Sequence, residues 1–188
     1  MKKPLLIPML LAAAVFTGCP HTINTTQESK LTDKTYSIDG INFVMKAIHS
    51  VTDGMLGADN QSDNKKHTVS LSAYRIGETE VTQELWIKVM SGNPSNFTGN
   101  LKNPVEKVSW LNCIVFCNEL TKKVTELGAG ECVYYTDAAF TTAYTAADAA
   151  SNTIPHAKWT AKGFRLPTEA EWEWAALGGT QNKWARTN

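Results

Sequence analysis

The sequence predicts a mixed α+β domain in which short strands come first and helices follow. Apolar and polar residues alternate on both sides of Asp39-Gly40, a pattern typical of a β-hairpin. Apolar positions later recur at helical spacing between residues 110 and 127. Residues that can cap a helix N-terminus stand at Thr82, Ser109 and Thr168.

Residues 1–18 have the pattern of an export signal. Lys2 and Lys3 precede an apolar run over 5–16 that is too short to span a bilayer, and small residues then lead to Cys19. A signal peptidase that cuts before a cysteine needs small side chains just upstream. We therefore expect cleavage after Gly18 and a lipid on Cys19, as in a bacterial lipoprotein. The alternative is an ordinary cleavable signal that a cysteine happens to follow.

From residue 20 to about residue 34 the chain has almost no apolar side chains. We therefore expect residues 19–35 to form a flexible tether between the lipid and a single domain at 36–188. Such a protein is located in the bacterial cell envelope, either periplasmic or surface-exposed, with membrane lipid as one partner. Lysine and arginine together number 18, as do aspartate and glutamate, and this balance gives no reason to expect a nucleic-acid partner.

The predicted strands begin with the hairpin over residues 36–45. Polar residues 59–66 are expected to form a surface loop before strand-like alternation resumes at Val69. That alternation changes phase at Tyr74, which indicates a bulge or a second short strand.

Two of the three predicted helices lie in the middle of the chain. The first begins after Thr82 and stops at residues 91–94. The second begins after Ser109 and runs to Leu127, with Asn118 expected to face water together with Glu119, Lys122 and Lys123. A short strand is expected at 133–135. The Ala/Thr-rich stretch 138–150 has no clear pattern.

The third helix begins with an acidic cluster that is predicted to be structural. Thr168 and Glu171 have the spacing of a capping box, and Arg165 is close enough in sequence to pair with a carboxylate. Glu169 and Glu173 flank Glu171, and acidic groups favour a helix N-terminus. The alternative is that these carboxylates serve acid–base chemistry or bind calcium.

Three cysteines besides Cys19 are candidates for core packing. Cys113 and Cys117 share one face of the predicted second helix, on its apolar stripe. A soft-metal site with Cys132 as third ligand is one alternative, and a disulfide from Cys132 to either helix cysteine is another. The histidines are scattered. The residues alone assign no catalytic group and no metal ligand.

Five blocks of sequence, in this order, resemble the formylglycine-generating (sulfatase-modifying) enzyme family: Gly77–Trp86 (GETEVTQELW), Asn93–Phe97 (NPSNF), Pro104–Trp110 (PVEKVSW), Phe116–Asn118 (FCN) and Gly163–Glu173 (GFRLPTEAEWE). The resemblance implies a C-type-lectin-like fold with little regular secondary structure. It also implies an enzyme that uses oxygen, copper held by two cysteines, and structural calcium to oxidise a sulfatase cysteine to formylglycine. Other members of the family only bind ligands, including surface lipoproteins with variable loops.

In that family the copper cysteines follow the segment that is similar to 165–179, so the resemblance covers the N-terminal part of a domain and transfers no catalytic or metal-binding role. We therefore expect no cofactor in this chain and a membrane-anchored, non-catalytic protein. The alternatives are part of a copper-dependent oxidase acting on sulfatase cysteines, a lectin-like display protein with a protein or carbohydrate ligand, and a gene fragment without function.

The leader generates the first testable prediction. Labelled fatty acid should enter the full-length protein in a bacterial host, and Cys19→Ser should abolish labelling because serine lacks the thiol that accepts the lipid. Release of the wild-type protein as a soluble, unlabelled form would contradict the prediction.

Overall fold

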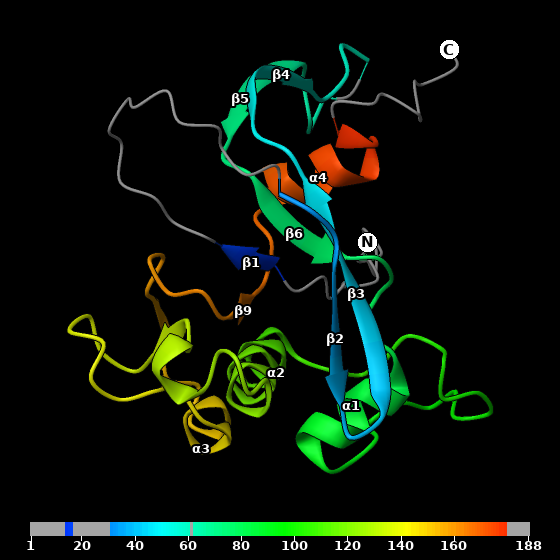
Figure 1. Cartoon of the computed structure of the whole chain (residues 1–188). Coiled ribbons are helices and arrows are strands. Elements are labelled where there is room, and N and C mark those ends of the chain that lie inside the picture. Colours follow the sequence, from blue (N-terminus) through cyan, green and yellow to red (C-terminus); the bar gives the residue numbers. More distant parts are fainter. Residues whose placement is uncertain (1–13, 17–30, 61, 180–188) are drawn as a thin grey trace, which may run out of the picture.

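The computed structural model describes residues 14–16, 31–60 and 62–179 and has the predicted mix of helices and small sheets (Figure 1). The larger sheet is antiparallel and five-stranded, with the order β2-β3-β6-β1-β9. Its strands are β2 (Lys34–Ile38), β3 (Ile41–Ile48), β6 (Tyr74–Gly77), β1 (Ala14–Phe16) and β9 (Phe164–Arg165).

The predicted hairpin is confirmed as β2 and β3. Its two turn residues have positive φ, 47° at Asp39 and 82° at Gly40, as a tight type I′ connection requires. Tyr36 and Met45 turn their side chains into the core. Strand β2 begins at Lys34, so the last two residues of the predicted tether belong to the sheet.

The second sheet pairs β4 (Val51–Leu56) with β5 (His67–Leu71), and the loop between them was predicted. Strand β4 was not predicted, because a register shift between Val51 and Gly54 and a positive φ of 54° at Asp53 break its alternation. A Cβ at Gly54 would lie 2.9 Å from the ring of Trp174, so only glycine lets this helix residue pack on the strand. The phase change at Tyr74 is confirmed as the start of a separate strand, β6.

The three predicted helices are α1 (Gln83–Met90), α2 (Trp110–Lys123) and α4 (Glu169–Ala176), and each begins directly after its predicted cap. Helix α2 ends four residues before the expected Leu127, because Val124 is extended. It is the centre of the main core, where Trp86 stacks on Phe116 with 4.9 Å between ring centroids. No described helix is long and apolar enough to cross a membrane.

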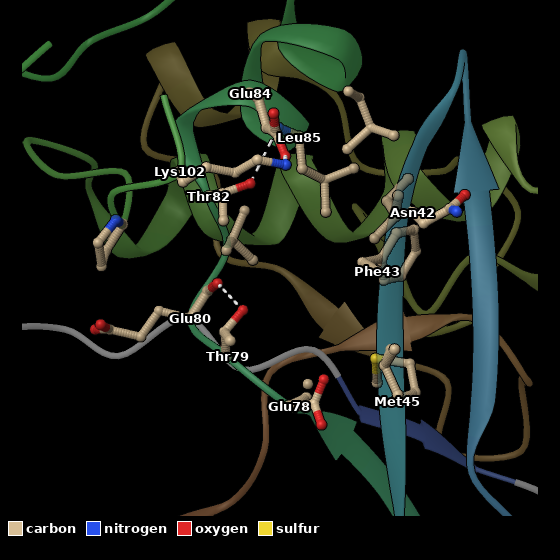
Figure 2. Close-up of a pocket in the computed structure, with 16 residues that line it drawn as sticks. Asn42, Phe43, Met45, Glu78, Thr79, Glu80, Thr82, Glu84, Leu85 and Lys102 are labelled. Carbon is tan, nitrogen blue, oxygen red and sulfur yellow. Dashed lines mark hydrogen bonds and ion pairs between the residues drawn. The ribbon is translucent and has the colours of Figure 1, made fainter. Parts of the chain in front are cut away.

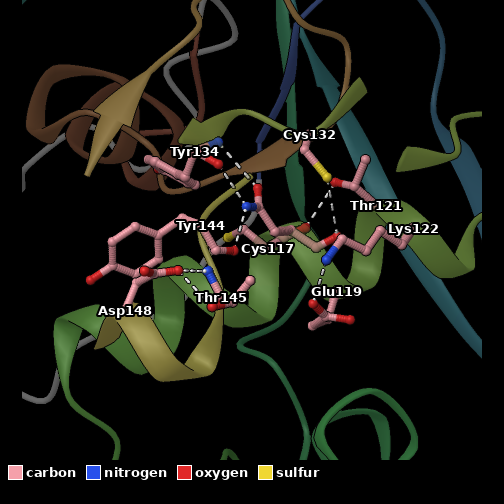
Figure 3. A network of polar contacts seen from close by, with 10 residues as sticks. Cys117, Glu119, Thr121, Lys122, Cys132, Tyr134, Tyr144, Thr145 and Asp148 are labelled. Atoms are coloured by element: carbon pink, nitrogen blue, oxygen red, sulfur yellow. Dashed lines mark hydrogen bonds and ion pairs between the residues drawn. The ribbon is translucent and has the colours of Figure 1, made fainter. Parts of the chain in front are cut away.

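Asn118 does not face water as predicted, because it is fully buried and holds the chain that follows α2. Its partners in that chain, Tyr134 and Tyr144, belong to the polar network of Figure 3. Its Nδ2 donates to the carbonyls of Tyr134 (2.8 Å) and Tyr144 (3.0 Å), and its Oδ1 accepts from the Tyr134 amide (3.1 Å). This fixes β7 (Tyr134–Tyr135), which pairs with β8 (His156–Ala157), and the start of α3 (Ala146–Ala150).

Strand β1 lies within the predicted signal peptide, between β6 and β9. The remaining leader residues, Cys19 and the tether up to residue 30 lie outside the described part of the chain.

The buried amide generates a stability prediction. Asn118→Ala should lower the free energy of unfolding of the full chain by about 2–4 kcal/mol, because it leaves buried main-chain groups of residues 134 and 144 without partners. Urea unfolding measures this. Lys123→Ala, at an exposed position on the same helix, is the control and should change stability by less than about 0.5 kcal/mol. Equal effects would contradict the assigned role of Asn118.

Candidate functional site

The predicted acidic cluster contains a buried ion pair. Arg165 on β9 donates from Nη1 and Nη2 to the two carboxylate oxygens of Glu171 on α4, at 2.7 and 2.5 Å, and the two residues are only 2% and 4% exposed. The Thr168 amide also donates to Glu171 at 2.8 Å, while the Thr168 hydroxyl accepts from the Glu171 amide at 3.2 Å. The capping box is therefore present, and its carboxylate serves the ion pair as well.

The electrostatics of Glu171 follow from this geometry. Burial raises its pKa, but the hydrogen bonds from Arg165 and Thr168 and the charge of Arg165 outweigh burial, so the pKa lies below its usual value. The Tyr74 hydroxyl donates to the main-chain carbonyl of Glu171 at 2.5 Å. Glu171 therefore links β6, β9 and α4, and its contacts hold these three elements together.

The other two glutamates point elsewhere. Glu169 is exposed, whereas Glu173 accepts from the Gly57 amide (3.0 Å) and from Asn64 Nδ2 (2.9 Å) in the loop between β4 and β5. The three carboxylates thus serve three different environments and do not form a converging acid–base pair. Trp172 is 39% exposed whereas Trp174 is buried, because the two side chains point to different sides of α4.

The three described cysteines are free thiols without measurable exposure. Burial raises the pKa of Cys113 to about 12 and also raises the pKa values of Cys117 and Cys132. No disulfide joins these three cysteines in the structure. Cys113 and Cys117 pack into the core from α2, and Cys132 Sγ lies 3.8 Å from the Asn118 carbonyl oxygen. Among the described residues, no three His, Cys, Asp or Glu side chains gather as a metal site would require.

A cavity of about 490 Å³ lies between β3 and the segment that leads into α1 (Figure 2). It forms because β3 and β6 stop pairing at Gly77, after which the Glu78 amide still donates to the Val44 carbonyl at 2.9 Å and the chain then diverges. Phe43 and Met45 point from β3 into this space. The sequence pattern did not reveal the cavity, because it depends on where two strands separate.

The walls of the cavity differ in chemistry. Its interior is apolar, with Phe43, Met45 and Leu85, whereas Glu78 and an ion pair between Glu84 and Lys102 lie at its rim. A concave apolar space with a few polar groups is the usual form of a small-ligand site. The arrangement suits a ligand with one apolar face and with hydroxyl or amino groups that donate to carboxylates.

Comparisons with known proteins agree with the fold. A family model described as the sulfatase-modifying factor enzyme 1-like domain matches residues 21–188. Chaperone protein LppX of Paenibacillus barcinonensis is 33% identical over 189 residues, which cover 97% of this chain and 58% of that protein. The solved structure of Treponema denticola variable protein 1 shares 42% identity with a TM-score of 0.65, covering 79% of this chain and 57% of that one. The chain thus spans less than three-fifths of the length of these two relatives.

The ion pair generates a prediction about pH. Since the pKa of Glu171 is lower in the folded chain, its contribution to stability is present above the unfolded pKa of about 4.3 and is lost as the pH falls through the folded value. Glu171→Gln should cost about 3–5 kcal/mol at pH 7, because it removes the carboxylate that accepts two hydrogen bonds from the buried Arg165 guanidinium, and should flatten the acid limb of the profile.

Urea midpoints between pH 3 and 7 measure both effects. Glu169→Gln is the matched control on the same helical turn, where the exposed side chain should contribute less than about 0.5 kcal/mol. A Glu171→Gln variant with wild-type stability at pH 7 would show that the pair is dispensable.

Proposed function

Because the chain belongs to the sulfatase-modifying factor enzyme 1-like family, we propose that it uses the scaffold of that family to bind a ligand at the bacterial cell envelope and does not oxidise cysteine. In this proposal a lipid on Cys19 anchors the domain to a membrane, and the domain is periplasmic or surface-exposed. The ligand is a protein or carbohydrate group that fills the cavity beside β3.

The observation that carries the proposal is the burial of the described cysteines. A thiolate is the form that binds soft metals and reacts, and burial disfavours it. Cys113 and Cys117 lie in the core with raised pKa values, so copper and a client peptide could not both reach them. These thiols do not fit the copper pair that the family's oxidases use, and no catalytic step is assigned to them.

The cavity supports the binding half of the proposal. It offers an apolar floor at Phe43 and Met45 and a carboxylate at Glu78, so sugar rings and peptide side chains both match its chemistry. One relative is named a chaperone and another a variable protein. The name of the first relative supports including polypeptides among the ligands.

Binding can be followed on two methionine methyl groups. When the protein is labelled on methionine methyls, a monosaccharide or an apolar tripeptide that occupies the cavity should shift the Met45 resonance, because Met45 lines it. Met55 on β4 is the internal control, since it is not among the lining residues. The binding proposal fails if no probe of either class moves Met45, or if Met45 and Met55 always move together.

The second candidate, part of a copper-dependent formylglycine-generating oxidase, rests on the family match. The full chain, incubated with copper, oxygen and a sulfatase-type cysteine peptide, should give no aldehyde by mass spectrometry. A copper-dependent aldehyde that disappears in Cys113→Ala would replace the binding proposal with the oxidase.

A further inference from the structure

The cavity beside β3 lies between the edges of two extended segments. Five consecutive residues of β3, 41–45, line one side of it, and six consecutive residues, 77–82, line the other. Because neighbouring side chains of a strand point to opposite faces, such unbroken runs place the cavity against the edge of each segment. Figure 2 shows the two edges spreading apart from the level of Glu78 toward Leu85. The cavity is therefore a gap between two strand edges that have stopped pairing.

The edge of β3 that faces this gap has main-chain groups without a partner. Ile38 lies opposite Ile41 across the two-residue turn, so residues 41, 43 and 45 direct their main-chain groups to β2 and residues 42 and 44 direct theirs to the cavity side. The Val44 carbonyl, which accepts from the Glu78 amide, agrees with this alternation. Asn42 is exposed and precedes the part of β3 that pairs with β6, and among the described residues nothing bonds to its main chain on this side. Its N–H and C=O can thus pair with an added strand.

The charges around the gap favour a basic ligand. Among the described lining residues, Lys102 is the only basic one, and it already pairs with Glu84. Glu78 has only a distant partner, Lys46 at 3.9 Å, whose ammonium has a nearer carboxylate. None of the ion pairs of the described chain includes Glu80. A lysine or arginine side chain would therefore find apolar contacts for its stem and carboxylates for its head group.

The two ends of the described domain lie far from this edge. Near its start, the Thr32 carbonyl accepts from Arg75 Nε at 2.8 Å, and Arg75 pairs with the residue of β3 just before Ile48. At its end, a Cβ on Gly179 would lie 3.8 Å from Ile48. Both points are at the end of β3 that is about six residues, or roughly 20 Å, from Asn42. With the leader removed by the proposed cleavage, this geometry favours an occupant from outside the chain.

A second copy of the chain does not fit the gap through its own β3. The other edge of β3 is paired with β2 in every copy. The cavity of about 490 Å³ has the size of a small-ligand site, which admits one short segment and not a pair of strands. The gap therefore suits a single extended segment whose edges are both free.

We propose that the cavity beside β3 accepts a short extended segment of another polypeptide, which pairs with the β3 main chain at Asn42 and brings a lysine or arginine side chain to Glu78. The inference rests on the proposed ligand-binding function and decides between its two ligand classes. A sugar ring matches the apolar space, but it does not offer the alternating main-chain donors and acceptors that complete a strand edge.

The test uses the full chain, processed in a bacterial host and purified in detergent. The probe is a fluorescent peptide, Lys-Val-Thr-Val-Lys, blocked at both ends and followed by anisotropy. Its matched control has the same side chains but carries methyl groups on two adjacent main-chain nitrogens, one for each edge. The unmodified peptide should bind at least about tenfold more tightly, because methylation removes the donors that strand pairing needs.

Two further measurements locate the bound peptide. By NMR, exchange of the Asn42 amide with solvent should slow when the peptide binds, whereas exchange of the Ser72 amide, which is exposed and outside the cavity, should not change. Glu78→Gln should weaken binding of the lysine peptide by about threefold or more and should not affect a peptide with norleucine in place of lysine. Glu169→Gln, on the exposed turn of α4, is the control and should bind both peptides as the wild type does.

Equal binding of the methylated and unmodified peptides would overturn the inference. So would an Asn42 amide that is already protected without peptide, since the gap is then filled by the chain itself in a monomer or by a second copy in a dimer. A monosaccharide that shifts the Met45 resonance while the peptide does not would overturn the inference and leave the proposed function standing. If neither probe moves Met45, the proposed function fails as well, so the two failures are distinguishable.

Discussion

The buried pair of Arg165 and Glu171 is the constraint on which the arrangement of the domain depends. Two charges removed from water are tolerated only where their geometry is good and the remaining lone pairs are satisfied. Both conditions hold, because the two groups meet through two hydrogen bonds and the Thr168 amide completes the carboxylate. Through the Glu171 carbonyl the same residue also holds Tyr74. One side chain and its main chain thus set the positions of two strands and a helix.

Two buried side-chain amides fix the position of the chain where it has little regular secondary structure. Gln83 donates from Nε2 to the carbonyls of Phe97 (3.0 Å) and Pro104 (3.2 Å), and its Oε1 accepts from Asn93 at 2.9 Å. Asn118 does the same for the chain around residues 134 and 144. Irregular loops need partners for their polar main-chain groups when they are buried. These two amides supply those partners, which gives the loops a fixed shape from which ligands can be recognised.

The sequence pattern predicted the turns and helix caps, which depend only on residues close together in the chain. The turn at Asp39-Gly40 and the caps at Thr82, Ser109 and Thr168 involve residues within four positions of each other, so the sequence pattern contains all of their geometry. The position of Asn118 could not be predicted in this way, because its partners lie 16 and 26 residues away. Strand β4 was missed because a register shift and the positive φ of Asp53 break its alternation. The cavity beside β3 was missed because it depends on where β3 and β6 separate. The family resemblance, carried by five ordered blocks, gave the correct fold where periodicity gave only its class.

If the chain is exported as proposed, the three buried thiols constrain the order of events during export. A chain that crossed the membrane unfolded would expose Cys113, Cys117 and Cys132 to an oxidising compartment before α2 had docked. A disulfide formed at that stage would join sulfur atoms that the native core keeps apart, and exchange would be slow once they were covered. After folding, the absence of exposure protects the same atoms from oxidants. Under the proposed export, the core would therefore have to fold faster than its thiols are oxidised.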